Sequence, residues 1–459
     1  MKLIIVGAGK VGFSLAANLC QEGHGVTVID TDRQRLDLLE EHLNVSTVNG
    51  NAAKLEILAA ADAANTDLII AVTDKDELNM VTCFLARQAG VKSAVARVRA
   101  PGYSDLNNSQ ALDALGVDML INPERVTAAE IAKLIEYPEA SFVSYFGGGE
   151  LIMLELRLSR TCLRLGQQLK TLSCPVPCIV VGIQRQGQLL IPRGDDRLLA
   201  GDEVLLLSAT KDIRRVEDYL GVAPRRPRSI AILSGALTGY YLAEMLDKGE
   251  RRYNVKLFEP DRQRGQELAT GLNRTAIIHA GAGAAISMFD DENVGESDLL
   301  IAASEDDKDN LFASVVAHHL GVGKTIAQIR GEYAPLIERA GVDKVVSPNR
   351  LTLDTILRFI NRTRILSLTR FDDSPGQITE FLVAATAPAA GSSIMALDFP
   401  VAAIICMIIR GERHIIPSGR DLIEPGDVII VFSLPQALGA VEELFAAAEN
   451  GRGGAEAQS

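Results

Sequence analysis

The sequence predicts an α/β protein with two Rossmann-like, doubly wound parallel-sheet domains, each followed by a small α+β domain. Three observations predict this fold. The chain opens with an apolar run that ends in a glycine-rich turn, it continues as alternating strand and helix patterns, and its second half repeats the first. Strict alternation of strands and helices is typical of parallel sheets with helices on both faces.

The opening segment has the pattern of a nucleotide-binding βαβ unit, because an apolar run is followed by GAGKVG at residues 7–12. In this G-x-G-x-x-G, Gly7 allows a tight turn, Gly9 lets the backbone approach a pyrophosphate, and Gly12 lets helix and strand pack closely. The next helix offers its N–H groups and partial positive charge to phosphates. Asp30 ends the second strand, where an acid accepts hydrogen bonds from ribose hydroxyls.

The rest of the first domain continues the alternation of short apolar strands and amphipathic helices. We expect helices over 33–42, 55–61, 80–89 and 104–115, and strands over 45–48, 68–72, 93–98 and 118–121. Parallel sheets of this kind bind ligands at the carboxyl ends of their strands. Those ends are the glycine loop, Asp30, Gly50-Asn51, Val72-Thr73 and Arg97.

From about Gly149 the pattern changes to short strands separated by turns, which predicts a small α+β domain that closes near Gly221. Then the first pattern starts again. A strand over 230–233 precedes SGALTG, and a second strand ends at the acid Glu259. Four turn residues of the first small domain recur at a constant offset of 225, which indicates a tandem duplication. They are Pro192, Gly194, Gly201 and Asp202, repeated as Pro417, Gly419, Gly426 and Asp427.

These patterns predict the domain boundaries of the 459-residue chain. A nucleotide-binding domain spans 1–135 and a small domain 136–222, followed by a proline-broken basic linker at 223–228. A second domain of the first kind spans 229–360, its small domain 361–448, and a disordered tail 449–459.

Composition excludes several classes of function. The net charge of −13 argues against nucleic-acid binding and against direct anchoring on anionic lipid. No apolar run approaches the length of a membrane-spanning helix, and the glycine loop interrupts the only candidate signal peptide, so we expect a cytoplasmic protein. The six cysteines have no zinc-binding spacing; Cys174 and Cys178 flank Pro-Val-Pro, and free thiols are the expected state.

Taken together, these segments resemble the regulator-of-potassium-conductance (RCK, or KTN) family over nearly the whole chain. The resemblance rests on GAGKVG, on a GNA turn where the family more often has G-D-A, on AVTDKDELNM, ARVRAPGY and NPERVTAAEIAKLI, and on the turns of both small domains. It implies a regulatory subunit, peripheral on the cytoplasmic face of the inner membrane, docked on a TrkH- or TrkG-like potassium-translocating membrane protein. It also implies a homo-oligomeric ring, a tetramer, whose shape responds to NAD(H), ATP or ADP.

The family's ligand contacts, carried over to this sequence, fall on the carboxyl edge of the first sheet, and the resemblance implies no catalytic or metal-binding residue. The residues are Gly7, Ala8, Gly9, Lys10, Val11, Gly12, Asp30, Asn51, Ala52, Val72, Thr73, Asn79, Arg97 and Glu124, with Glu259 as the surviving acid of the second half.

Three of these residues have an alternative role. Arg97 suits phosphate, because a guanidinium forks onto phosphate oxygens, or it forms a surface salt bridge. Glu124 reaches a neighbouring subunit's nucleotide or is only the acid that begins a helix. Lys10 meets phosphate or is simply solvated.

The second half departs from the fingerprint, since Ala236 stands where Gly9 stands and its methyl would crowd a pyrophosphate. Gln328 replaces Arg97, and Asn349 replaces Glu124. This half binds a nucleotide weakly, binds a different one, or serves as scaffold.

The alternative function is an NAD-dependent oxidoreductase, because fold alone does not decide function. Hydride transfer needs an acid or base facing the nicotinamide, commonly a histidine. The six histidines form no catalytic motif with a carboxylate: His24, His42, His279, His318, His319 and His414. A passive oligomerisation scaffold is the third possibility, and the intact first fingerprint argues against it.

Overall fold

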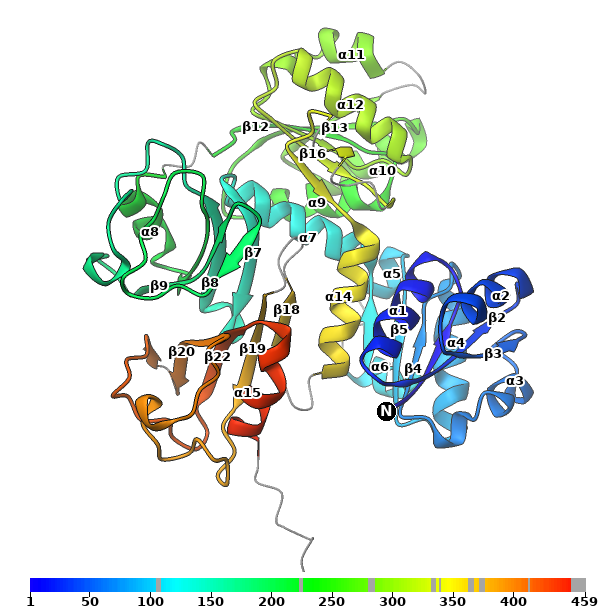
Figure 1. Cartoon of the computed structure of the whole chain (residues 1–459). Coiled ribbons are helices and arrows are strands. Elements are labelled where there is room, and N and C mark those ends of the chain that lie inside the picture. Colours follow the sequence, from blue (N-terminus) through cyan, green and yellow to red (C-terminus); the bar gives the residue numbers. More distant parts are fainter. Residues whose placement is uncertain are drawn as a thin grey trace, which may run out of the picture. The chain divides into compact units, whose positions relative to one another are not determined.

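The structure is a computed structural model that describes residues 1–104, 109–222, 226–279, 285–331, 336–337, 340–361, 367–370, 376–411 and 413–446 (Figure 1). The predicted tail and residues 223–225 of the predicted linker lie outside this range. The chain divides into two compact units by its internal contacts. One contains Met1–Ala132 and Pro227–Ile356, and the other contains Lys133–Arg226 and Leu357–Ser459.

The first unit contains two parallel sheets, and the first sheet has the order β3-β2-β1-β4-β5-β6. The direction of strand order reverses at β1, which is where sheets of this kind bind their ligands. The strands are β1 (Lys2–Val6), β2 (Gly25–Asp30), β3 (Ser46–Asn49), β4 (Leu68–Ala71), β5 (Ser93–Arg97) and β6 (Met119–Ile121).

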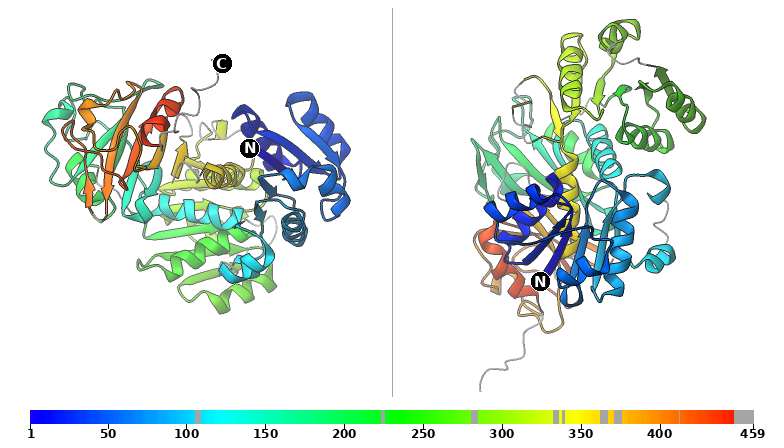
Figure 2. Two further views of the ribbon diagram at one scale, coloured as in Figure 1. Left: turned by 90° about the horizontal axis from the view of Figure 1, so that it is seen from below. Right: turned by 90° about the vertical axis from the view of Figure 1, so that its right-hand side faces the viewer.

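Helices cover both faces of this sheet (Figures 1 and 2), so the central strands are buried on both sides. On one face Ile4 and Ile69 pack with Leu58 and Cys83 from the helices. The helices that precede β6 are α1 (Lys10–Gln21), α2 (Arg33–His42), α3 (Leu55–Ala60), α4 (Asp76–Gln88), α5 (Pro101–Ser104) and α6 (Ser109–Leu115). Helix α7 (Pro123–Glu136) follows β6 and lies beside α9 in Figure 1. Helix α4 begins earlier than predicted, at Asp76, because acidic side chains in the first turn favour a helix N-terminus.

The second sheet has the corresponding order, β14-β13-β12-β15-β16-β17, again with parallel pairing. Its strands are β12 (Ser229–Leu233), β13 (Asn254–Glu259), β14 (Thr275–His279), β15 (Leu299–Ala302), β16 (Lys324–Gln328) and β17 (Lys344–Val346). Its helices are α9 (Leu237–Lys248), α10 (Arg262–Gly271), α11 (Ala285–Asp291), α12 (Asp307–His319) and α14 (Pro348–Asn361). The predicted fold class and the duplication are confirmed.

The second unit contains two antiparallel sheets with matching orders, β10-β9-β11-β8-β7 and β21-β20-β22-β19-β18. The first comprises β7 (Ala140–Phe146), β8 (Leu151–Arg157), β9 (Cys178–Arg185), β10 (Gln188–Leu190) and β11 (Glu203–Ala209), with helix α8 (Ile213–Leu220). The second comprises β18 (Ser367–Arg370), β19 (Gln377–Leu382), β20 (Ala403–Arg410), β21 (Arg413–Ile415) and β22 (Val428–Ser433), with helix α15 (Leu438–Phe445).

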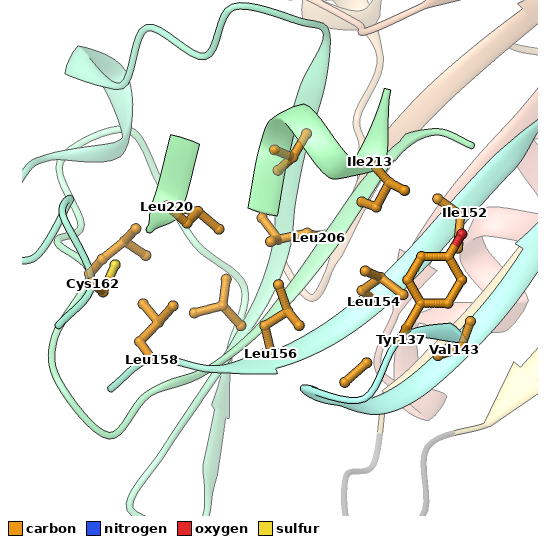
Figure 3. Packing of buried hydrophobic residues seen from close by; sticks show 14 of the residues in the cluster. Tyr137, Val143, Ile152, Leu154, Leu156, Leu158, Cys162, Leu206, Ile213 and Leu220 are labelled. Atoms are coloured by element: carbon orange, nitrogen blue, oxygen red, sulfur yellow. The ribbon is translucent and has the colours of Figure 1, made fainter. Parts of the chain in front are cut away.

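Two kinds of core hold the second unit together. Each small domain has its own core; in the first, Leu154 and Leu206 of the sheet pack with Ile213 and Leu220 of α8 (Figure 3). A further core is built by both small domains together. Four of its residue pairs are related by the offset of 225: Met153 and Ile378, Val181 and Cys406, Leu205 and Ile430, and Leu207 and Phe432. Both domains therefore bury the same sheet face in one shared core.

The repeated G-D turns contain a repeated ion pair. Arg185 donates from Nε and Nη2 to the two carboxylate oxygens of Asp202, each at 2.8 Å, and Arg410 pairs with Asp427 at the same distances. The glycine before each aspartate has a positive φ, 90° at Gly201. Asp202 is 1% exposed, so its charge depends on this arginine.

None of the described helices is long and apolar enough to span a bilayer.

We predict that Asp202→Asn lowers stability by about 2–4 kcal/mol at neutral pH, because it leaves Arg185 without its buried counter-charge. Burial alone would raise the pKa of Asp202, but the Arg185 guanidinium holds it below its ordinary value. This stabilisation is therefore complete above the unfolded-state pKa of about 3.9 and is lost as the pH falls through the lower native pKa. The urea-unfolding midpoints of the two proteins should begin to approach each other below about pH 4 and converge only below the native pKa of Asp202.

The control is Asp195→Asn in the same domain. Asp195 pairs with Lys170, but its side chain is 79% exposed, and exposed pairs contribute less than about 1 kcal/mol. An equal loss in both variants would contradict the assigned role of Asp202.

Candidate functional site

The loop after β1 is shaped by two glycines that the chain itself requires. Gly7 has a φ of 106°, and a Cβ atom there would lie 3.2 Å from the backbone nitrogen of Thr73. A Cβ atom at Gly12 would lie 1.8 Å from the Gly7 carbonyl oxygen. Any side chain at Gly12 would therefore push α1 away from the loop, so both glycines are explained by folding alone.

Gly9 is different, because nothing in the described part of the chain requires it to be glycine. Its φ of −72° is available to any residue, and no atom of the described residues lies within 4 Å of the position that a Cβ atom would take. Gly9 precedes α1, no side chain caps that helix, and the first N–H groups of a helix have no partner within it. The open space before Gly9 thus fits an anion held by a helix N-terminus.

Asp30 links the end of β2 to the glycine loop. Its Oδ2 accepts a hydrogen bond from the Ala8 nitrogen at 2.6 Å, and its Oδ1 accepts one from the Asp32 nitrogen at 2.8 Å. Each carboxylate oxygen has a second lone pair with which it can accept a ribose hydroxyl. The side chain is only partly buried, so Asp30 can both fix the loop and meet a ligand.

Asn79 is fully buried on α4 and uses all of its hydrogen-bonding capacity within the chain. Its Oδ1 accepts from the nitrogen and Oγ1 of Thr73, at 3.0 and 2.6 Å. Its Nδ2 donates to the carbonyls of Thr73 and Arg97, at 3.1 and 2.9 Å. Asn79 therefore joins the ends of β4 and β5. Asn310 makes the matching bonds to Ser304 and Gln328 in the second half.

The end of β5 gathers two arginines around one buried carboxylate. Arg97 donates from Nη1 to the Thr73 carbonyl at 3.2 Å, while its buried Nε has no hydrogen-bond partner among the described residues. Glu124 is 5% exposed; its Oε1 accepts from Arg99 Nε at 2.7 Å, and its Oε2 has no hydrogen-bond partner in the part of the chain that the structure describes. Arg99 also pairs with Glu305, with Nη2 3.0 Å from Oε1.

These contacts have electrostatic consequences. Burial lowers the pKa of Arg97, which the Glu124 carboxylate partly offsets. Burial would lower the pKa of Arg99, but the Glu124 and Glu305 carboxylates together outweigh it, and the pKa of Arg99 is raised. Arg99 is a further residue of this cluster that was not predicted from the sequence, although it stands two residues after Arg97, the spacing that places side chains on one side of an extended chain.

The structure places the remaining predicted residues along the same edge. Lys10 is exposed, whereas Val11, Ala52 and Val72 are buried in the first domain. Asn51 is exposed, and its Oδ1 accepts from the Ala53 nitrogen at 2.9 Å. Following the strand order, the edge reads Asn51, Asp30, the glycine loop, Thr73, Arg97 and Glu124.

The second half has a different loop at the corresponding edge. Ser234 replaces Gly7 and crowds the turn, since a Cβ atom at Gly239 would lie 2.2 Å from its Oγ. Ala236, which replaces Gly9, is 2% exposed. Gln328 replaces Arg97; it is buried and donates to the Ser304 carbonyl at 3.3 Å.

Arg264 lies close to Glu259, the acid at the end of β13. Arg264 donates from Nη1 to the Gly235 carbonyl at 3.2 Å, and its Nε lies 3.8 Å from Glu259 Oε2. Glu259 is 1% exposed and also accepts from the Asp261 nitrogen at 3.1 Å. The first-half counterpart, Arg35, instead pairs with Asp32 and is 56% exposed. Glu259 thus already has partners within its own domain, Arg264 and the Asp261 nitrogen.

Comparisons with known proteins agree with this architecture. The family model described as the TrkA-N domain matches residues 3–123 and 230–348, and the TrkA-C domain matches 153–221 and 378–446. The Trk system potassium uptake protein TrkA homolog of Archaeoglobus fulgidus is 33% identical over 446 residues, which covers 97% of this chain and 100% of the relative. Trk system potassium uptake protein TrkA of Halomonas elongata is 32% identical over 454 residues, covering 97% and 98%.

Two solved structures share the fold of nearly the whole chain. The GsuK channel bound to NAD matches with a TM-score of 0.62 at 17% identity, over 97% of this chain and 78% of that chain. The GsuK RCK domain matches with the same TM-score and identity, over 97% and 94%. At this identity the likeness concerns the fold.

We predict that Asn79→Ala loosens the ends of β4 and β5, because it leaves buried backbone groups of Thr73 and Arg97 without partners. The free energy of local opening, measured by hydrogen exchange of the Thr73 amide, should fall by about 2–3 kcal/mol. Asn51→Ala is the matched control, since Asn51 is exposed and its side chain accepts one local bond. A comparable loss in both variants would mean that the buried network has no special role.

Proposed function

The chain belongs to the TrkA family of Trk-system potassium uptake proteins, and on that premise we propose that it is the nucleotide-sensing regulatory subunit of such a system. The family assignment confirms the resemblance drawn from the sequence motifs. The observation that carries the proposal is Gly9, a glycine with no internal reason to be one, at the start of a helix and beside an acid on the next strand.

We propose that the ligand is NAD(H), ATP or ADP. Its phosphates would lie before Gly9 and the N-terminus of α1, and Asp30 would accept from the ribose hydroxyls. A carboxylate at this position would repel the additional phosphate of NADP. In support, the related fold of GsuK has been solved with NAD.

The predicted contacts differ in the roles that we propose for them. Gly7, Gly12 and Asn79 would shape the edge, whereas Gly9, Asp30 and Arg97 would meet the ligand. The guanidinium of Arg97, at the end of β5, suits a phosphate oxygen, because guanidinium hydrogen bonds to phosphate are charge-assisted. Glu124, held by Arg99, would set the charge around that phosphate.

We propose that the chain binds one nucleotide, in its first half. In the second half the buried methyl of Ala236 replaces the open space of Gly9, and Arg264 pairs with Glu259. Binding there would have to displace Arg264 from its ion pair with Glu259 and from its hydrogen bond to the Gly235 carbonyl, which costs both interactions. The second half would then serve chiefly as scaffold.

The regulatory mechanism that we propose is a ligand-biased ring. Four chains would assemble on the cytoplasmic face of the inner membrane, docked on a TrkH- or TrkG-like potassium-translocating subunit. Exposed apolar side chains at corresponding places on α4 and α12, Val81 at 47% and Phe312 at 56%, support assembly with further subunits. A nucleotide would shift the ring only by the difference between its affinities for the two arrangements.

The relatives are potassium uptake proteins, which favours a regulator over the NAD-dependent oxidoreductase. To distinguish a regulator from an oxidoreductase, the purified protein is incubated with NADH and the consumption of the nucleotide is measured. A regulator returns the nucleotide unchanged, whereas steady oxidation of NADH would refute the proposal.

We predict that Gly9→Val weakens binding of NADH, NAD, ATP and ADP by at least about 100-fold, because the side chain would occupy the space of the phosphates. Isothermal titration calorimetry checks this, and gel filtration checks that assembly is unchanged. Gly271→Val is the matched control, since Gly271 lies at the end of α10, also has no atom within 4 Å of its Cβ position, and is remote from the edge. Unchanged binding in Gly9→Val would refute the site.

We predict a stoichiometry of one nucleotide per chain in the wild-type protein. Asp30→Asn should weaken that binding by about tenfold, the loss expected for one charge-assisted hydrogen bond, while Glu259→Gln should leave both affinity and stoichiometry unchanged. Two nucleotides per chain, with one lost in Glu259→Gln, would instead make Glu259 a ligand contact of a second site.

A further inference from the structure

The first small domain contains a cavity that the proposed nucleotide site does not use. Its volume is about 430 Å³, which lies in the range of sites for small molecules. Its walls come from the end of β8, from the end of β9 with the turn that follows it, and from the loop that leads into β11. All of the lining residues belong to this one domain, so the first small domain builds the cavity by itself.

Three of the lining residues form a row across neighbouring strands. In the antiparallel ladders, Glu203 of β11 lies opposite Arg157 of β8 on one side and opposite Gln184 of β9 on the other. Residues directly opposite each other in such ladders project from the same face of the sheet, with their Cα atoms about 4.5–5.5 Å apart. A cation, an anion and an amide therefore lie side by side at the cavity.

The fold does not use the polar groups of this row. Arg157 and Glu203 have opposite charges and lie on adjacent strands, yet they form no ion pair with each other or with any other described residue. Gln184, and Gln186 in the turn after β9, likewise have no side-chain hydrogen bond within the part of the chain that the structure describes. All four side chains are thus available to a ligand.

The other two charged residues of the lining neutralise each other. They are Arg185 and Asp202, which form the ion pair described above with two bonds of 2.8 Å. The lining therefore has no net formal charge, but one cation and one anion in it are free. Such a site favours a zwitterion. The nucleotides proposed for the first domain carry several negative charges, which Glu203 would repel.

The second small domain keeps the fold of this region but lacks the polar row. At the offset of 225 the row is replaced by three apolar residues in the same ladder positions: Leu382, Ile409 and Val428. The buried arginine–aspartate pair, by contrast, is present in both copies. The strand ends of this fold thus form equally well with apolar residues, and folding does not explain the polar row of the first copy.

We propose that this cavity binds a small zwitterion, an α-amino acid with a hydrogen-bonding side chain. Its carboxylate accepts from the Arg157 guanidinium, and its ammonium donates to the Glu203 carboxylate. An α-amino acid carries both charges on one carbon, which suits charged residues on adjacent strands. Gln184 and Gln186 can both donate and accept, so they meet a side chain that carries an amide.

The cavity lies next to the core that both small domains build together. Glu203 stands two residues before Leu205 on β11, so both side chains project from the same face of the sheet, and Leu205 belongs to the shared core. A bound amino acid would therefore act on the small domains, independently of the nucleotide site.

The test is a ligand-detected NMR titration of the full-length protein, with L-glutamine as the probe. We expect saturable binding with a dissociation constant below about 10 mM, and the same value with and without ADP. N-acetyl-L-glutamine, which lacks the ammonium, and L-glutaminamide, which lacks the carboxylate, should each bind at least about tenfold more weakly. No binding of L-glutamine, or equal binding of all three compounds, would overturn the proposal.

Exchanging the row for the residues of the second copy tests the site. Arg157→Leu and Glu203→Val should each weaken L-glutamine binding at least about tenfold, and circular dichroism should show that both variants stay folded. Arg160→Leu is the matched control, since Arg160 is also exposed, lies three residues further along the chain and is not among the lining residues. Binding that survives both exchanges, or that is lost equally in Arg160→Leu, would overturn the proposal.

Discussion

The first domain depends on one contact at which no side chain fits, that between Gly12 on α1 and the Gly7 carbonyl. This close approach lets α1 begin directly above the end of β1, so that the helix N-terminus faces the carboxyl edge of the sheet. Asn79 then fixes the next two strand ends, and Asp30 fixes the loop from the other side. Within this framework Gly9 alone faces open space. The requirements of the fold thus fall on Gly7 and Gly12, and Gly9 is left for the ligand that we propose.

Much of this architecture could be predicted from the sequence, because parallel strands buried on both faces are unmistakable apolar runs and the turn residues recur at a fixed offset. The residues at the carboxyl edge of the first sheet could be predicted because they follow the ends of these strands. What could not be predicted depends on side-chain direction. The segment 96–99 contains two arginines, and the sequence does not indicate which of them pairs with Glu124. In the structure it is Arg99. Likewise Asn79 reads as a ligand contact until its four internal hydrogen bonds are seen.

Comparison of the two halves separates the features that folding needs from those that we assign to a ligand. Asn79 and Asn310 bond the corresponding backbone groups, and the Arg185–Asp202 pair has its copy in Arg410–Asp427, so these folding features are common to both halves. The features that we assign to a ligand differ between the two halves. Arg35 and Arg264 occupy corresponding helical positions, yet one lies on the surface and the other reaches the acid at the end of its sheet. A change of one loop allows the same residue type to turn inward.

The shared core of the small domains has a consequence for the origin of the chain. Because it uses the same positions from both copies, it has the self-complementary form of an interface between identical subunits. An ancestor with a single repeat would have buried this face as a homodimer. Joining two copies in one chain makes that association intramolecular, so that it no longer depends on the protein concentration. It also released each copy from symmetry: in a homodimer every substitution appears twice, whereas in the fused chain one copy can lose an activity while the other retains it.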